Sequence, residues 1–100
     1  MRAIAVKQSR EFQVWFAGVT DRLIRATILA RVERLKLDNP GDVRAVGGGV
    51  FEMRIHLGAG WRVYYTWRGA ELVILLGGGT KGTQSGDIKK AQELAGRILP

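Results

Sequence analysis

Two neighbouring segments of the sequence, residues 50–57 and 61–67, alternate between polar and apolar side chains. Side chains in a β-strand point to opposite faces of the sheet in turn, so this alternation predicts two strands, each with one apolar and one polar face. Between the segments lies Gly58-Ala59-Gly60, and glycine readily adopts the backbone conformations of tight turns. The pattern therefore predicts a β-hairpin whose apolar face covers a hydrophobic core.

The expected register of this hairpin brings several polar side chains together. If Leu57 and Trp61 close the turn, three cross-strand pairs share the polar face: His56 with Arg62, Arg54 with Tyr64, and Glu52 with Thr66. Directly opposed side chains in antiparallel strands lie close enough to act together. Such a face could bind and process a phosphodiester. The alternative is the ordinary solvated face of a half-exposed sheet.

The balance of charges favours a nucleic acid or an acidic protein as partner. The 100 residues carry 16 Lys and Arg against 9 Asp and Glu, a net charge of +7. The absence of cysteine excludes disulfides, thiolate chemistry and cysteine-bound zinc, and the single histidine excludes sites with several histidines. We therefore expect neither a metal nor a cofactor. We also expect no signal peptide and no membrane span, and hence a cytoplasmic protein.

Hydrophobic spacing and turn residues outline a single α+β domain over residues 1–100. Ser9 and Asp21 are suitable N-caps for two helices joined by a tight turn, an αα-hairpin. We expect the order β-α-α-β-β-β-α, with helices over one face of an antiparallel sheet and a short C-terminal helix. The expected positions are a strand over 3–7, helices after Ser9 and over 21–37, the two hairpin strands, a buried strand over 72–76, and a helix beginning at Ile88.

A glycine-rich segment, residues 77–87, separates the last expected strand from the last helix. We expect it to be a flexible loop. Bare backbone N–H groups in such a loop can bind a phosphate, but the nucleotide-binding P-loop spacing is absent because Gly82 follows Lys81 where that motif has Ser or Thr. What the segment contributes is Lys81, a cation at the end of a strand. The alternative is a solvated loop lysine.

Individual residues of the hairpin indicate how a phosphodiester could be cleaved. Histidine has an ordinary pKa of about 6.5, close to neutral pH, so His56 could accept a proton. Arg54 and Arg62 could bind a phosphate and stabilise the added negative charge of the transition state, or could instead pair with Glu52. Trp61 could stack on an RNA base, although an aromatic residue in a strand also packs in a core.

Many short motifs, in order and at matching spacing, resemble the RelE/ParE toxin superfamily, most closely its HigB-like branch of addiction module killer proteins. The motifs of the helical half are Phe12-x-x-Trp15-Phe16, Asp21-x-x-x-Arg25-Ala26 and Arg31-Val32-x-Arg34-Leu35. Those of the second half are Gly41-Asp42-Val43, Gly47-x-Gly49-Val50, Glu52-Met53-Arg54-Ile55-His56, Gly58-x-Gly60-Trp61-Arg62-Val63-Tyr64, Leu75-Leu76-x-Gly78, Lys81-x-Thr83-Gln84 and Asp87-Ile88. The resemblance covers essentially the whole chain.

The resemblance implies the toxin of a bacterial type II toxin–antitoxin module. Its partner would be a cognate antitoxin, a small helix-turn-helix protein, and DNA would be bound only by the complex of the two. The released toxin would be a metal-independent endoribonuclease that cleaves mRNA in the ribosomal A site. There the ribose 2′-OH attacks the adjacent phosphate and leaves a 2′,3′-cyclic phosphate and a 5′-OH. Two alternatives are a ParE-like inhibitor of DNA gyrase and an inactive family member that only binds a partner.

The resemblance also implies roles for particular residues. The basic positions of the family's sites match Arg54, His56, Arg62 and Lys81, and the sequence departs from well-known members at Glu52, where they carry a lysine. Asp87 stands where some members have a tyrosine. The expected roles are His56 as the base on the 2′-OH and Arg62 and Arg54 on the scissile phosphate. Lys81 would neutralise charge or assist the leaving 5′ oxygen, and Tyr64 would support the phosphate. Trp61 could stack on a base, and Asp87 is a further candidate for proton transfer.

Overall fold

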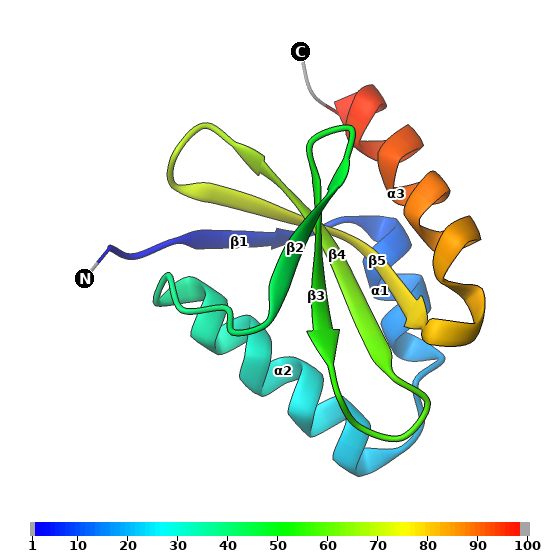
Figure 1. Cartoon of the computed structure of the whole chain (residues 1–100). Helices are drawn as coiled ribbons and strands as arrows, with labels where there is room; N and C mark the ends of the chain where they lie inside the picture. The colour runs from blue at the N-terminus through cyan, green and yellow to red at the C-terminus, as the bar shows by residue number, and fades with distance from the viewer. Residues whose placement is uncertain (1, 99–100) are drawn as a thin grey trace.

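The five strands of the computed structural model form one mixed sheet in the order β1-β5-β4-β3-β2 (Figure 1). The structure describes residues 2–98. In chain order the elements are β1 (Ala5–Gln8), α1 (Arg10–Ala17), α2 (Arg22–Lys36), β2 (Val43–Gly47), β3 (Val50–Ile55), β4 (Trp61–Arg68), β5 (Leu72–Thr80), the 3-10 helix η1 (Lys81–Thr83) and α3 (Gln84–Ile98). The predicted α+β class is confirmed.

The two N-terminal helices begin where side chains satisfy free backbone N–H groups. Ser9 Oγ accepts a hydrogen bond from the backbone N–H of Phe12 at 3.0 Å, and Asp21 Oδ1 accepts one from that of Ile24 at 3.1 Å. Both predicted N-caps are therefore confirmed. A short link, residues 18–21, joins α1 to α2.

Helices α1 and α2 cover one face of the sheet, and the apolar face of the β3–β4 hairpin points toward them as predicted. The side chains buried between the layers include Phe12, Ile24, Ile28, Val32, Leu35, Met53, Ile55, Val63, Tyr65, Val73 and Leu75. Burying an aliphatic or aromatic side chain of this size contributes on the order of 1.5–3 kcal/mol each. This core fixes the hairpin against the helical layer.

Helix α3 packs on the opposite face of the sheet (Figure 1), so the expectation that all helices cover one face is wrong. A second, smaller core lies beneath it and contains Val50, Tyr64, Leu76, Ala91, Leu94 and Ala95. The helix is also not short: it begins at Gln84 and has 15 residues, the same number as α2. Consequently α3 covers part of the face that carries the polar side chains of the hairpin.

The sheet has one strand more than expected and is not wholly antiparallel. Residues 43–47 form the edge strand β2, which pairs with β3 and contains a bulge between Ala45 and Gly47. Its short, half-exposed sequence lacks the strong alternation of the hairpin strands. β1 pairs with β5 in parallel. Parallel neighbours need a long connection, and here it contains α1, α2, β2, β3 and β4.

The glycine-rich segment is not the flexible loop that the sequence predicts. Residues 77–80 continue β5, and 81–83 form η1. Side chains fill the space on both faces of this part of β5: the indole of Trp15 covers Gly78, and the carboxylate of Asp87 covers Gly79. A Cβ atom on either glycine would overlap these groups. The glycines therefore permit close packing of two layers on one strand.

The register of the hairpin differs by two residues from the prediction. Ile55 and Trp61 are the last pair of the ladder, and His56 lies beyond it in a loop. The loop closes with its own hydrogen bond, from Gly60 N to Leu57 O at 3.1 Å, and its two glycines adopt positive φ. The three predicted polar pairs are therefore wrong; the observed pairs on this face are Arg54 with Arg62, Glu52 with Tyr64, and Val50 with Thr66.

Candidate functional site

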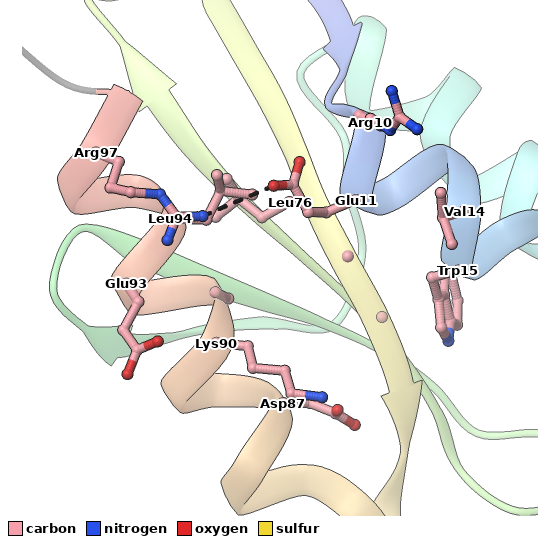
Figure 2. A pocket seen from close by; sticks show the side chains of 13 residues that line it. Arg10, Glu11, Val14, Trp15, Leu76, Asp87, Lys90, Glu93, Leu94 and Arg97 are labelled. Atoms are coloured by element: carbon pink, nitrogen blue, oxygen red, sulfur yellow. Dashed lines mark ion pairs between the residues drawn. The ribbon is translucent and has the colours of Figure 1, made fainter.

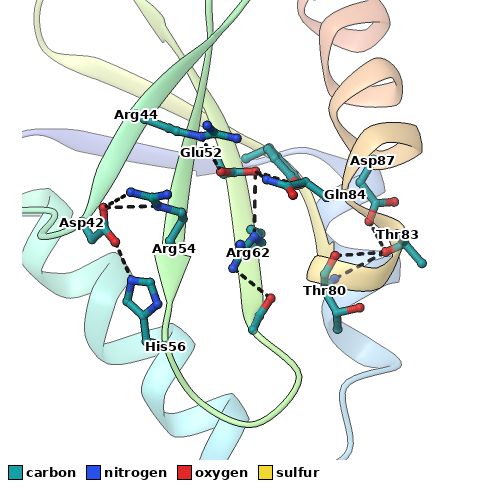
Figure 3. A network of polar contacts seen from close by, with 12 residues as sticks. Asp42, Arg44, Glu52, Arg54, His56, Arg62, Thr80, Thr83, Gln84 and Asp87 are labelled. Atoms are coloured by element: carbon teal, nitrogen blue, oxygen red, sulfur yellow. Dashed lines mark hydrogen bonds and ion pairs between the residues drawn. The ribbon is translucent and has the colours of Figure 1, made fainter.

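Two arginines of neighbouring strands face each other on the sheet surface next to α3 (Figure 3). Arg54 of β3 is the direct cross-strand partner of Arg62 of β4. Like charges at directly opposed positions repel each other, so the pair is stable only with anions nearby. Asp42 supplies the anion beside Arg54, and Glu52 supplies the one nearest Arg62.

Asp42, which directly precedes β2, contacts both Arg54 and His56 (Figure 3). Arg54 donates from Nη2 and Nε to Oδ1 at 2.9 and 3.3 Å, and His56 Nε2 lies 2.5 Å from Oδ2. These hydrogen bonds, first from Arg54 and then from His56, lower the pKa of Asp42 to about 2. The side chain of His56 remains 69% exposed. An ionised carboxylate therefore holds an accessible imidazole beside an arginine.

The backbone that carries Asp42 is fixed by Arg31 of α2. Arg31 donates from Nε and Nη2 to the carbonyl oxygen of Pro40 at 3.0 and 2.7 Å, and from Nη1 to that of Arg54 at 2.8 Å. Nη2 also lies 3.3 Å from the carbonyl oxygen of Asp42, which in addition accepts the backbone N–H of Arg54 at 2.9 Å. Helix α2 thus sets the position of the Asp42 segment relative to the end of β3.

Arg62 is only 7% exposed and lies next to the turn that follows β3. Its Nη1 donates to the carbonyl oxygen of Gly60 at 3.1 Å, and the same oxygen accepts the backbone N–H of Lys81 at 2.9 Å. This shared acceptor places the start of η1 beside Arg62. The Nε atom lies 4.0 Å from Glu52 Oε2 and, among the residues that the structure describes, has no hydrogen-bond partner. Because this Nε atom is buried, its N–H is an unsatisfied donor inside the network and not one that a bound anion could reach.

Glu52 is fully buried and lies at the centre of a network that joins β2, β3, β4 and α3. Its Oε1 accepts from Arg44 Nε at 3.0 Å, and its Oε2 accepts from Gln84 Nε2 at 2.7 Å and from the Tyr64 hydroxyl at 3.2 Å. Burial alone would raise the pKa of Glu52, but the hydrogen bonds from Gln84, Arg44 and Tyr64 hold it below its ordinary value. A lysine at this position would therefore need a different set of partners.

Asp87 lies at the border between this network and α3. Thr83 Oγ1 donates to Asp87 Oδ2 at 2.5 Å. The glycine that the carboxylate covers, Gly79, pairs with Arg62 across the β4–β5 ladder. Asp87 is thus adjacent to the strand position of Arg62, on the side away from Arg54.

Two further predicted residues lie apart from the exposed cluster. Tyr64 is fully buried with its hydroxyl toward Glu52; burial first, and then the charge of Glu52, raises the pKa of that hydroxyl. Trp61 points to the other face of the sheet, where its ring centroid lies 6.2 Å from that of Trp15. The accessible candidate surface therefore consists of Arg54, His56, Lys81 and the edge of Arg62.

A separate cleft of about 510 Å³ lies between α1 and α3 over the second half of β5 (Figure 2). Its apolar lining is formed by Val14 and Trp15 of α1, Leu76 of β5 and Leu94 of α3. Charged side chains surround the mouth of the cleft. Arg97 of α3 and Glu11 of α1 form an ion pair there, with Arg97 Nη2 3.7 Å from Glu11 Oε2. Asp87 also lines the cleft, so it borders both the cleft and the polar network.

Within residues 2–98, no three His, Asp or Glu side chains come together in a way that could hold a metal ion. The same part of the chain has no helix with the length and apolar character needed to cross a bilayer.

Sequence reasoning missed Asp42 and the central position of Glu52. Asp42 belongs to the turn-forming run over residues 38–42, and His56 lies 14 positions later in the sequence. One signal was present: the Val-Arg-Ala-Val run that follows Asp42 is typical of a short edge strand. Recognising β2 would have placed Asp42 beside the end of β3.

The fold is similar to that of the toxin RelE. The structure superposes on the free state of a double arginine mutant of the Escherichia coli toxin RelE with a TM-score of 0.73. The superposition covers 97% of this chain and 99% of that chain, at 11% sequence identity. At such low identity the likeness concerns the fold alone.

The sequence comparisons define the family. Residues 10–97 match the family of phage-derived Gp49-like proteins, and the chain belongs to that family. A protein of Haemophilus influenzae, described as uncharacterized, is 44% identical over 92 residues, which cover 92% of this chain and 93% of the relative. The matched region contains the whole polar network described above.

Proposed function

We propose that this protein is the toxin of a type II toxin–antitoxin module and acts as an endoribonuclease on ribosome-bound mRNA. The observation that carries the proposal is the direct pairing of Arg54 with Arg62, with the exposed imidazole of His56 held next to Arg54. Membership of a family of RelE- and HigB-type toxins and the RelE-like fold support it. Within that superfamily we place the chain in the HigB-like branch.

The proposed reaction is a transesterification within the RNA. His56 takes the proton of the ribose 2′-OH, the 2′ oxygen forms a bond to the adjacent phosphorus, and the bond from phosphorus to the 5′ oxygen breaks. Arg62 and Arg54 stabilise the additional negative charge on the phosphoryl oxygens. The departing 5′ oxygen takes a proton from Lys81, and Asp87 is a further candidate for proton transfer. The products are a 2′,3′-cyclic phosphate and a 5′-OH.

The proposal includes a partner and a location. A cognate antitoxin, an acidic helix-turn-helix protein, would neutralise part of the net charge of +7 and keep the toxin inactive. DNA would be bound only by the toxin–antitoxin complex. The toxin itself would act in the cytoplasm, where ribosomes and mRNA are found.

The test is 5′-end mapping of a defined mRNA on purified ribosomes. Wild-type protein is compared with His56→Ala and Arg62→Ala, and Arg68→Ala serves as the control because it removes an exposed arginine from the far end of β4. We expect cuts in the A-site codon that each site variant weakens by on the order of 10²–10³-fold, while Arg68→Ala cleaves normally. Circular dichroism of each variant checks that it is folded.

Intact mRNA in the presence of folded wild-type protein, free of antitoxin, would refute ribosome-dependent cleavage. Repeating the assay with naked RNA then separates a ribosome-independent nuclease from a protein without nuclease activity. Inhibition of DNA supercoiling by gyrase would instead support a ParE-like toxin. A protein inactive in all three assays would be a binding module.

A further inference from the structure

We propose that Asp42 is a positioning residue of the active site, which holds His56 in the tautomer required of a base and fixes Arg54 opposite Arg62. The inference rests on the proposed nuclease function and adds to it a residue outside the hairpin. It is drawn from the two contacts of one carboxylate. Oδ1 accepts from Arg54 Nη2 at 2.9 Å, and Oδ2 lies 2.5 Å from His56 Nε2.

The carboxylate determines which ring nitrogen of His56 carries the proton. Asp42 is ionised at neutral pH because the hydrogen bonds from Arg54 and His56 lower its pKa to about 2. An ionised carboxylate only accepts hydrogen bonds, so a neutral His56 beside it has its proton on Nε2. Nδ1 then keeps its lone pair. It is this nitrogen that could take a proton from a substrate hydroxyl.

The backbone of Asp42 is held as firmly as its side chain. Its carbonyl oxygen accepts the backbone N–H of Arg54 at 2.9 Å, and Arg31 donates to the carbonyl oxygens of Pro40 and Arg54 on either side of the contact. Because Arg31 belongs to α2, its hydrogen bonds fix the carboxylate of Asp42 relative to the helical layer. The position of the carboxylate is therefore set by α2 and β3, whereas His56 reaches it from the loop that follows β3.

An ordinary surface ion pair is the competing explanation, and it predicts something different. The side chains of Asp42 and Arg54 are 36% and 32% exposed, and that of His56 is 69% exposed. Ion pairs with this exposure contribute little to stability. If the contact were only such a pair, its loss would leave both the tautomer of His56 and the rate of cleavage unchanged.

Asp42→Asn separates the two explanations because it preserves shape and changes donor chemistry. Arg54 can only donate, so the amide oxygen turns to Arg54 and the amide NH₂ group faces His56 Nε2. Nε2 must then accept, and the proton moves to Nδ1. We expect the turnover rate to fall by on the order of 10²–10⁴-fold, as for a base held in the wrong tautomer. KM for RNA should change little because Arg54 keeps its hydrogen bond.

The experiment joins nitrogen-15 NMR to the cleavage assay. The chain has one histidine, so a ring-labelled sample gives a single pair of imidazole signals without assignment. By NMR we expect the Nε2–H tautomer in the wild type and in Asp42→Glu, and the Nδ1–H tautomer in Asp42→Asn. In the cleavage assay we expect Asp42→Glu to recover part of the rate. Glu33→Gln, which removes an exposed carboxylate paired with Lys36, is the matched control and should match the wild type in both assays.

Each outcome decides one claim. An Nε2–H tautomer that persists in Asp42→Asn, or wild-type cleavage by this variant, overturns the positioning role of Asp42. A wild-type protein that shows the expected tautomer but cleaves no RNA overturns the proposed function and, with it, the contribution of Asp42 to cleavage. Loss of cleavage in Asp42→Asn through a higher KM at unchanged turnover would show that Asp42 acts through substrate binding and would overturn the tautomer mechanism.

Discussion

The indole ring of Trp15 lies directly on Gly78, so a Cβ atom on that glycine would overlap Cη2 of the ring. Two layers meet at this point, because Trp15 belongs to α1 and Gly78 to β5. The ring also packs against Trp61, with ring centroids 6.2 Å apart. Helix α1 can approach the sheet this closely only where the strand has no side chain.

Gly78→Ala should destabilise the protein by about 1–3 kcal/mol, because overpacking forces the ring or the helix to move. The matched control is Gly96→Ala on the exposed side of α3, where nothing lies within 4 Å of an added Cβ. That change should stabilise the protein by about 0.5–1 kcal/mol through helix propensity. Urea denaturation of both variants measures the difference. Equal effects at the two positions would contradict the close packing.

Arg31→Lys should destabilise the protein by about 1.5–3 kcal/mol although it preserves the charge. The guanidinium donates to the carbonyl oxygens of Pro40, Asp42 and Arg54 in a fixed fork, which a single ammonium group cannot reproduce. Arg34→Lys, at an exposed position one turn further along α2, is the control and should change stability by less than about 0.5 kcal/mol. A tolerated Arg31→Lys would mean that the fork is not needed.

Acid should destabilise the protein through two carboxylates. Hydrogen bonds from Arg54 and His56 lower the pKa of Asp42 to about 2, and Glu52 has a pKa below its ordinary value despite its burial. The unfolded chain, in which Asp titrates near 3.9, therefore binds more protons than the folded one as the solution becomes acidic. The stabilisation is complete above about pH 5 and is lost as the pH falls toward about 2. Urea midpoints across this interval measure it.

Asp42→Asn offers an internal check of the same titration. The variant lacks one of the two groups, so its urea midpoint should fall less steeply with acid than that of the wild type. Parallel curves for the wild type and Asp42→Asn would show that the Asp42 contacts do not persist in solution.

Binding to RNA should weaken as salt rises, because each phosphate contact releases counterions from the nucleic acid. For single-stranded RNA the logarithm of the affinity falls with the logarithm of salt by about 0.7 per contact. Arg54→Ala should reduce that slope by about one contact, whereas Arg68→Ala should leave it unaltered. An oligonucleotide with a 2′-deoxy substitution at the cleavage position allows binding to be measured without cleavage. A slope near zero would exclude phosphate contacts.

What the sequence predicts well is what depends on near neighbours in the chain. The N-caps at Ser9 and Asp21 and the apolar stripe of α2 follow from local spacing, and the structure confirms them. The hairpin was also predicted, but its register was wrong because the loop uses two glycines with positive φ and its own hydrogen bond. A two-residue difference in loop length leaves the same side chains on the same face, so only the register separates the two possibilities.

The candidate site was predictable only in part, since its contacts join distant segments. The sequence indicated Arg54, His56 and Arg62 through their common strand pattern. Two of the contacts that hold them come from outside the hairpin. The carboxylate of Asp42, in the turn before β2, contacts Arg54 and His56. The amide of Gln84, which donates to Glu52, lies 32 positions further along the chain than Glu52. Such contacts follow from the sheet topology, and the extra strand β2 was the missing piece of that topology.

The parallel pairing of β1 with β5 affects how the chain can fold during its synthesis. Ala5 is the first residue of β1 to leave the ribosome, but its partner Leu72 follows only after most of the chain has been made. The entropy of closing so long a loop must be overcome before the pairing gives any stabilisation. We therefore expect β1 to join the sheet late. Until then, a nascent chain still attached to its own ribosome would have neither a complete sheet nor a firmly seated α1.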